Sequence, residues 1–253
     1  MLPAERKRKI VEVVGRRGAA KTSELSELFS TSAITIRQDL RELANQGLLL
    51  RTHGGAVSRD TPALEPTHQD KELLNIEAKK RIGKKAASLI RDNTTVFLAP
   101  GSTTLQMLPH LGARSNLRVL TNSLNISVEL SKVPSIEILI VGGALRRVSY
   151  AMVGPLAEQC FENIFADQLF MGAHSISYQR GLTEPSLDEA KIYKLMLNIS
   201  RETIVLADHT KFRTFAYAKI ADLDKVDMII TDDQLDTGYV EAIRALGSDV
   251  MIV

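Results

Sequence analysis

A single cysteine, Cys160, occurs among the 253 residues, so no disulfide can form within the chain. Such a chain suits a reducing compartment. The sequence contains no apolar run near the roughly 20 residues that a membrane-spanning helix needs, and its first residues lack the apolar core of a secretory signal peptide. We therefore expect a cytoplasmic protein with no membrane partner. Cys160 precedes Phe161 in a predicted helix and is interpreted as a buried packing residue.

Clusters of metal ligands are also missing. No histidine pairs with another histidine or with the cysteine at a spacing typical of metal ligands. The five histidines are His53, His68, His110, His174 and His209. The order of residues supports no Ser-His-Asp arrangement either. We expect no metal, no cofactor and no catalytic residue.

Positive charge is concentrated near the N-terminus. The formal net charge of the chain is only +2, but residues 1–59 hold 11 Lys and Arg against 6 Asp and Glu, whereas the remaining residues are slightly acidic. A small basic domain joined to a larger acidic one is typical of a nucleic-acid-binding module fused to a second unit. The basic residues at positions 6–9 are interpreted either as a solvated face or as phosphate contacts.

Residues 22–57 read as two short helices followed by a hairpin. Small polar residues at 30–32 interrupt the helical pattern, and Ser32 can cap a second helix that runs to about Gln46. Gly47 ends that helix, and Gly54 with Gly55 can turn a strand at 48–53 back into residues 56–57. This order of elements predicts a winged helix-turn-helix domain.

The second helix of this stretch has two chemically different faces. Ile36, Leu40 and Leu43 follow the spacing of a core stripe, whereas the opposite face carries side chains that can reach base edges or phosphates in the DNA major groove. An ordinary helix pair with a solvated charged face is the alternative. The candidate DNA contacts on the helix and the hairpin are Ser32, Ile34, Thr35, Arg37, Gln38, Arg41, Arg51 and His53.

One long motif extends over this stretch. Its helix part is Ser32-x-x-Thr35-Ile36-Arg37-x-Asp39-Leu40-x-x-Leu43, and its hairpin part is Arg51-x-His53-Gly54-Gly55-Ala56. The motif resembles the winged-helix signature of the DeoR/GlpR family of bacterial transcription regulators. The resemblance implies double-stranded operator DNA as a partner. Because such regulators usually pair on symmetric half-sites, it also implies a homodimer or homotetramer.

The chain after the hairpin divides into a short linker and a second domain. Pro62 and Pro66 among polar residues mark 58–70 as a linker, so the predicted domains are residues 1–57 and 71–253. Residues 71–91 form a predicted helix with a basic side that is interpreted as solvated. That side consists of Lys79, Lys80, Arg81, Lys84 and Lys85.

From residue 95 onward, short apolar runs alternate with helical patterns. The runs are residues 95–99, 117–121, 136–141, 167–171, 203–207, 226–230 and 249–253. Strands that alternate with helices predict an α/β fold, a Rossmann-like and mostly parallel sheet with helices on both faces. Such sheets bind ligands at the carboxyl ends of their strands, so we expect a ligand in the loops after these runs.

Several of these loops suit a phosphorylated ligand. Gly101 and the hydroxyl residues after it can cradle a phosphate at a helix start, and Lys211 offers it a cation. Each loop alone could be an ordinary cap or turn, but together they predict one pocket for a phosphorylated sugar or polyol. The candidate effector contacts are Gly101, Ser102, Thr103, Thr104, Asn122, Ser123, Gly142, Gly143, His174, Glu189 and Lys211.

The family resemblance extends over this second domain. The loops at 101–104, 121–123 and 207–212 resemble the effector domain of DeoR/GlpR regulators, which is similar in fold to ribose-5-phosphate isomerase and implies a sugar-phosphate inducer. Ala99 and His174 depart from the family pattern, because acidic residues are common there. His174 is interpreted either as a replacement ligand contact or as a structural histidine.

These observations favour a non-enzymatic regulator. Isomerisation needs a positioned general base, and the two departures remove carboxylates that could serve as one. A sugar-phosphate isomerase with an accessory domain is therefore the less favoured alternative. We expect a repressor of a sugar or polyol catabolic operon that a phosphorylated sugar or polyol releases from DNA.

Overall fold

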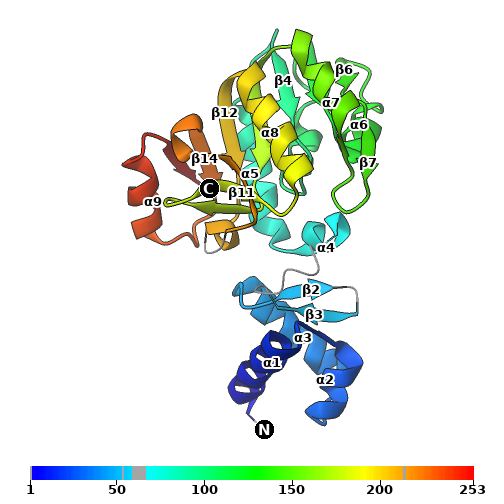
Figure 1. Cartoon of the computed structure of the whole chain (residues 1–253), viewed down its shortest axis with the longest axis vertical. Helices are drawn as coiled ribbons and strands as arrows, with labels where there is room; N and C mark the ends of the chain where they lie inside the picture. Colours follow the sequence, from blue (N-terminus) through cyan, green and yellow to red (C-terminus); the bar gives the residue numbers. More distant parts are fainter. Residues whose placement is uncertain (1, 53, 59–66, 213–214) are drawn as a thin grey trace. The chain divides into compact units, whose positions relative to one another are not determined.

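The computed structural model describes residues 2–52, 54–58, 67–212 and 215–253. The chain divides into two compact units, Met1–Asn75 and Ile76–Val253 (Figure 1). The boundary falls after residue 75 and not at residue 71. The reason is that helix α4 (His68–Leu73) is followed by Leu74, which packs against the core of the first unit. The expected linker at 58–70 lies largely outside the described residues.

The first unit consists of helices around a small three-stranded sheet. Its other elements are α1 (Pro3–Arg17), β1 (Ala19–Lys21), α2 (Thr22–Leu28), α3 (Ala33–Asn45), β2 (Leu50–Thr52) and β3 (Gly55–Val57). Strand β3 lies between β1 and β2, so the predicted hairpin gains a third strand. Gly55 permits this close approach, because a Cβ there would lie 2.1 Å from the carbonyl oxygen of Ala20.

Helix α3 begins and packs as its sequence predicts. Ser32 Oγ accepts a hydrogen bond from the backbone N–H of Thr35 at 3.2 Å, which caps the helix. Ile36, Leu40 and Leu43 are buried in the core of the unit, together with residues of α1 and α2. The opposite face of α3 is therefore left on the surface.

Two ion pairs fasten α3 to α1. Arg6 donates to both carboxylate oxygens of Asp39, at 2.5 and 3.2 Å, and Asp39 is buried. The hydrogen bond to Asp39 raises the pKa of Arg6. Lys7 bonds to Glu42 one helical turn later. The interpretation of residues 6–9 as a solvated face or as phosphate contacts is therefore wrong for Arg6 and Lys7, which hold α3 in place.

The second unit is built on a seven-stranded sheet in which all neighbouring strands are parallel. The strand order is β15-β14-β12-β9-β4-β5-β6. The strands are β4 (Thr95–Leu98), β5 (Leu117–Thr121), β6 (Ile136–Ile140), β9 (Ala166–Gly172), β12 (Ser200–Leu206), β14 (Met228–Thr231) and β15 (Asp249–Ile252). Each of the seven predicted runs forms one of them, so the predicted α/β class and parallel sheet are confirmed.

Helices cover both faces of this sheet. Alternate residues of a strand point to opposite faces: Val96 and Leu98 of β4 pack with α5, η1 and α6, whereas Phe97 packs in the core formed with α7, α8 and α9. The helical elements are α5 (Ile76–Ser88), η1 (Thr104–His110), α6 (Leu124–Leu130), α7 (Pro155–Cys160), η2 (Phe161–Asn163), α8 (Leu187–Ile199), η3 (His209–Phe212), η4 (Leu223–Lys225) and α9 (Thr237–Arg244).

Two small antiparallel sheets accompany the main one, and the sequence did not predict them. One is the hairpin of β7 (Ala144–Arg146) and β8 (Ala151–Val153), and the other joins β10 (Ser175–Ser177), β11 (Gly181–Glu184) and β13 (Ala218–Ala221). Cys160 ends α7 and is exposed, so its interpretation as a buried packing residue is wrong. No helix among the described residues is long and apolar enough to cross a bilayer.

The Arg6–Asp39 pair makes a stability prediction. Asp39→Asn leaves the Arg6 guanidinium without its charged partner in a largely buried place, so we expect a loss of about 3 kcal/mol in the free energy of unfolding of the first unit. Lys9→Ala is the control, because the Lys9–Glu5 pair is half-exposed and such pairs contribute about 0–1 kcal/mol. Urea titrations measure both changes. Equal, small losses would show that Arg6 and Asp39 do not hold α3.

Candidate functional site

The helix face predicted to meet DNA is exposed in the first unit. Ile34 keeps 76% of its surface accessible, and Arg37, Gln38 and Arg41 are exposed beside it. Ser32 and Thr35 belong to the cap, since their hydroxyl oxygens lie 2.9 Å apart. Arg51 lies on β2 and is half-buried. His53 lies outside the described residues.

Three guanidinium groups gather on this face. Burial lowers the pKa of Arg51, and the positive charges of Arg41 and Arg37 lower it further, against an opposing effect of Asp70. Arg51 on β2 therefore lies close to two arginines of α3. Like charges that lie together repel, and a DNA phosphate relieves that repulsion. Helix α3 and strand β2 thus contribute positive charges to the same surface.

The second unit brings the predicted effector loops to one edge of the main sheet. Because all seven strands are parallel, the loops after β4, β5, β6, β9 and β12 all leave at the carboxyl edge. The loop at 101–104 follows β4 and leads into η1, a 3-10 helix rather than the predicted α-helix. Thr104 in this loop is fully buried, and its hydroxyl finds no hydrogen-bond partner among the described residues.

A buried lysine joins this edge. Lys79 of α5 is only 2% exposed, so the interpretation of this residue as solvated is wrong. It lies one helical turn before Gly83, where α5 touches η1 so closely that a Cβ would come within 2.6 Å of Gln106. Lys79 thus shares the helix face that packs against η1.

Lys79 and Lys211 both act on one buried carboxylate. Asp208 follows β12 and is 1% exposed. Burial raises its pKa, but the charges of Lys211 and Lys79 and hydrogen bonds from Thr210 outweigh burial, so the pKa of Asp208 lies below its ordinary value. The positive charges of both lysines therefore act on the Asp208 carboxylate at the carboxyl edge. Neither Lys79 nor Asp208 was among the predicted contacts.

Asp232 fixes the loop that carries Lys211. The carboxylate follows β14, is buried, and accepts hydrogen bonds from the backbone N–H of His209 at 2.8 Å and from that of Gln234 at 3.0 Å. It also lies 2.9 Å from the ring nitrogen Nδ1 of His209. Burial raises the pKa of Asp232, but the hydrogen bonds from His209 prevail and lower it. These hydrogen bonds hold His209, the first residue of η3, in place.

Two other predicted contacts lie close together. Asn122 and Glu189 line a tightly packed gap, with Pro100 and Tyr193, that has no room for a water molecule. Asn122 donates to the carbonyl of Met152 at 2.9 Å, and its own buried carbonyl oxygen has no hydrogen-bond partner among the described residues. Glu189 is buried, and Arg146 of β7 lies 3.1 Å from its carboxylate.

The remaining predicted contacts also lie in loops that follow strands of the main sheet. Ser123 caps α6 by accepting from the N–H of Ile126 at 3.4 Å. Gly143 has φ +150°, and a Cβ there would lie 2.7 Å from the carbonyl oxygen of Val153, so packing against β8 explains this glycine. Gly142 is exposed. The backbone N–H of His174 donates to Glu184 at 2.9 Å. Ser102 and Thr103 are buried.

The comparisons with known proteins agree with this organisation. A family model described as the DeoR-like helix-turn-helix domain matches residues 6–62, and one described as the DeoR C terminal sensor domain matches residues 74–233. The chain belongs to the DeoR family. The sensor-domain match includes every residue named above at the carboxyl edge, from Lys79 to Asp232.

Relatives within the DeoR family match over nearly the whole chain. The regulator GlpR of Haloferax volcanii is 36% identical over 99% of this chain and 98% of its own. A putative aga operon repressor of Escherichia coli is 34% identical over 99% and 94%. The lactose phosphotransferase system repressor of Lactococcus lactis is 35% identical over 92% of both chains.

Among solved structures, ribose 5-phosphate isomerase A of Methanocaldococcus jannaschii aligns with 55% of this chain and 55% of its own, with a TM-score of 0.41 and 18% identity.

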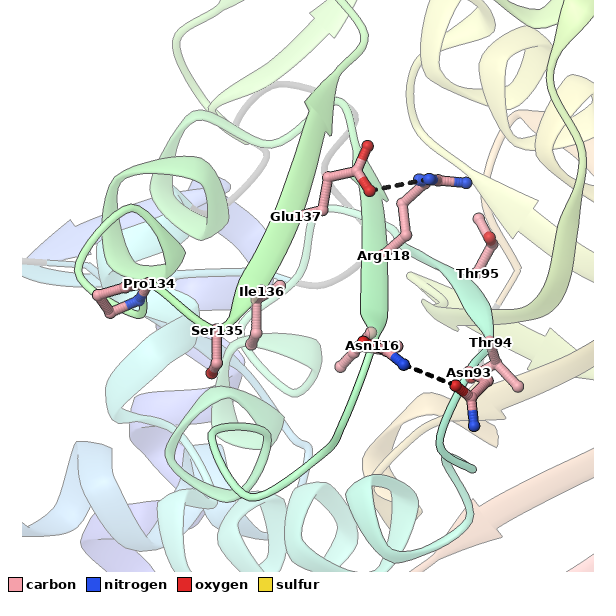
Figure 2. Close-up of a pocket in the computed structure, with 10 residues that line it drawn as sticks. Asn93, Thr94, Thr95, Asn116, Arg118, Pro134, Ser135, Ile136 and Glu137 are labelled. Atoms are coloured by element: carbon pink, nitrogen blue, oxygen red, sulfur yellow. Dashed lines mark hydrogen bonds and ion pairs between the residues drawn. The ribbon is translucent and has the colours of Figure 1, made fainter.

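An open cleft at the opposite edge of the sheet does not contain the predicted contacts. It is lined by the first residues of β4, β5 and β6 and by the turns before them (Figure 2). Arg118 and Glu137 are paired across it at 2.8 Å, and Asn116 donates to Asn93 at 2.8 Å. Among the described residues, no group of three or more His, Cys, Asp or Glu could hold a metal ion.

The position of Asp208 predicts how the second unit responds to its loss. Asp208→Asn leaves Lys79 buried beside an uncharged amide, so we expect a loss of about 3–5 kcal/mol in the free energy of unfolding at pH 7. A carboxylate whose pKa is lower in the folded state than in the unfolded state stabilises the fold at pH values above the unfolded-state pKa. This stabilisation is lost as the pH falls through the folded-state pKa. The difference between the variant and the wild type should therefore shrink below about pH 4.

Asp233→Asn is the matched control for this prediction. Asp233 is the next residue after Asp232, but its side chain is 70% exposed and pairs with Arg81 on the surface. Such a pair contributes about 0–1 kcal/mol. Urea titrations of both variants at several pH values measure the two losses. If Asp208→Asn is no more damaging than Asp233→Asn, Asp208 does not hold a buried lysine.

Proposed function

We propose that this DeoR-family chain is a repressor of a sugar or polyol catabolic operon, and that a phosphorylated sugar or polyol releases it from its operator. The observation that carries the proposal is the pair Lys79 and Lys211 around the one carboxylate of Asp208, at the carboxyl edge of the sheet. Both ammonium groups can form charge-assisted hydrogen bonds to a phosphate oxygen.

Neighbouring groups support the same ligand class. The loop at 101–104 supplies backbone amides and the buried Thr104 hydroxyl, both of which can donate to phosphate oxygens. The buried side-chain carbonyl oxygen of Asn122, which has no hydrogen-bond partner among the described residues, can accept from a sugar hydroxyl. The printed names of relatives, an aga operon repressor and a lactose phosphotransferase system repressor, support sugar metabolism as the setting.

The exposed face of α3 supports operator binding. Arg37 and Gln38 can reach base edges, and the methyl groups of Ile34 can touch a thymine methyl. Arg51 adds a phosphate contact from the wing. We propose that this chain acts in the cytoplasm on double-stranded operator DNA and that it binds its ligand without converting it, since Ala99 is buried where the related pattern commonly has a carboxylate.

For the first unit, we predict that Arg37→Ala and Arg41→Ala each weaken operator binding. A contact to a base should cost about 1–3 kcal/mol and relax specificity at one position, whereas a phosphate contact should weaken binding to all sequences alike. Arg91→Ala is the control, because Arg91 is exposed in the second unit. Gel-shift titrations at fixed salt, on operators selected from genomic fragments, measure the effects. Unchanged binding in both arginine variants would exclude α3 as the recognition helix.

For the second unit, we predict that the effector binds at least tenfold more tightly than its unphosphorylated parent. A charge-assisted hydrogen bond contributes about 1.5–3 kcal/mol, and a tenfold difference needs only about 1.4 kcal/mol. Lys211→Ala should remove most of this preference and leave operator affinity without ligand unchanged. Lys219→Ala is the control, since Lys219 pairs with Asp222 on the surface.

Calorimetry with matched ligand pairs measures this preference. Each sugar or polyol is titrated with and without its phosphate into the wild type and the two lysine variants. Equal affinity for both members of every pair that binds the wild type would contradict the phosphate site. So would a Lys211→Ala variant that retains the full preference.

A further inference from the structure

The outer edge of strand β6 lacks the usual protection of an edge strand. β6 lies at one end of the seven-stranded sheet, beside β5, and has the sequence IEILI. Natural edge strands commonly carry lysine, proline or a bulge that prevents pairing with another chain. β6 has none of these. Leu139 is 46% exposed and Ile140 is 52% exposed, so both side chains remain available for contact.

The backbone of β6 also has polar groups that point outward. Val141 donates its N–H to the carbonyl of Thr121 on β5 at 2.8 Å. Since successive residues of a strand alternate in direction, the backbone groups of Leu139 face β5 as well, whereas those of Ile138 and Ile140 face away. Within the described parts of the chain, no other element supplies hydrogen bonds to this outward side.

The opposite edge of the same sheet, strand β15, differs from β6 because a side chain forms a hydrogen bond to its outward backbone. At the two ends of β15, Asp249 donates to the carbonyl of Asp227, just before β14, and Val253 donates to that of Thr231, so the backbone groups of Val250 point outward. Arg244 of α9 donates its guanidinium N–H to the carbonyl of Val250 at 2.7 Å. A side chain therefore occupies the β15 edge. No such side chain is found on β6 among the described residues.

We propose that two copies of this chain pair through their β6 strands, antiparallel and around a two-fold axis at Leu139. In this register Ile138 of one copy lies opposite Ile140 of the other, and each such pair exchanges two backbone hydrogen bonds. The two seven-stranded sheets become one continuous sheet. The two Leu139 residues form a pair without hydrogen bonds, with Cα atoms about 4.5 Å apart.

We assign a second copy of this chain as the partner of β6, because the charges and side chains of this edge are complementary to those of the same edge in another copy. A two-fold contact uses the same residues on both sides, and this register places Glu137 opposite Val141 rather than opposite the second Glu137. Glu137 is already neutralised by Arg118 at 2.8 Å. The exposed side chains that meet near the axis are aliphatic. This inference does not depend on the proposed effector, because β6 pairing uses neither Lys79 nor Lys211.

Charge at the two-fold axis provides the first test. In Leu139→Lys and in Leu139→Glu, like charges would face each other across the axis, so each variant should sediment with about half the mass of the wild-type particle. An equimolar mixture of the two variants pairs opposite charges and should restore that mass. The chain itself is 27.9 kDa. The proposal is overturned if the wild type sediments as a single chain or if both variants keep the wild-type mass.

A cysteine placed at the axis provides a second, independent test on the full chain. Cys160→Ser removes the native thiol, and Leu139→Cys in that background brings two thiols within the Cα distance that a disulfide spans, about 4.4–6.8 Å. Mild oxidation of dilute protein should give a covalent dimer within minutes. The matched control, Leu156→Cys in the same background, lies on α7 and is 70% exposed, so it should form no covalent dimer while keeping the β6 contact. Crosslinking of both variants at the same rate, or of neither, contradicts β6 pairing.

Discussion

Parallel alignment of seven strands is the constraint on which the second unit depends. Because every strand runs in the same direction, every following loop emerges at one edge, and residues far apart in the sequence meet there. Asp208 after β12 thereby lies close to Lys79 of α5 and to Lys211 of η3. The ionised Asp208 carboxylate is stabilised there by the positive charges of both lysines, which lower its pKa against the effect of burial. The same charges make the edge suitable for an anion.

In the first unit, the ion pair of Arg6 and Asp39 lies on the inner side of α3, and the outer face of this helix remains accessible for binding. Asp39 turns inward to Arg6, so α3 is tied to α1 by charge as well as by Ile36 and Leu40. The outward face keeps Arg37 and Arg41, and Arg51 joins them from the wing. Three close guanidinium groups are unfavourable by themselves, and an oligoanion such as DNA compensates for that.

The sequence predicted the parts of this molecule that depend on local pattern. The seven apolar runs became the main sheet, and Ser32 became the cap of α3, because strand periodicity and capping act over a few residues. The hairpin β7–β8 and the sheet of β10, β11 and β13 were missed. Their strands are three or four residues long and, except for β8, mix polar with apolar residues, so they lack the apolar runs that mark the equally short β4, β14 and β15.

The site residues missed by the sequence depend on partners far away in the chain. Lys79 follows Ile76 and precedes Ile82 by three residues, so it lies within the apolar stripe of α5. That position was a usable signal, but its partner Asp208 is more than a hundred residues away. Arg6 and Asp39 are likewise joined only by tertiary packing. Gly143 and Ser123 have packing and capping roles that the sequence could not separate from ligand contact, because a close-packed glycine and a helix cap use the same residue types as a binding loop.

Release from the operator by a ligand requires that the two units be energetically coupled, so that a ligand at the carboxyl edge alters operator affinity. The most direct measurement titrates labelled operator with the full chain, with and without each member of a panel of sugar and polyol phosphates. We predict that one phosphate lowers operator affinity by about 5–150-fold, and that operator lowers the affinity for that phosphate by the same factor. The unphosphorylated parent should have no such effect at the same concentration. A panel in which no phosphate changes operator affinity, or in which the parents act as strongly, would contradict the account.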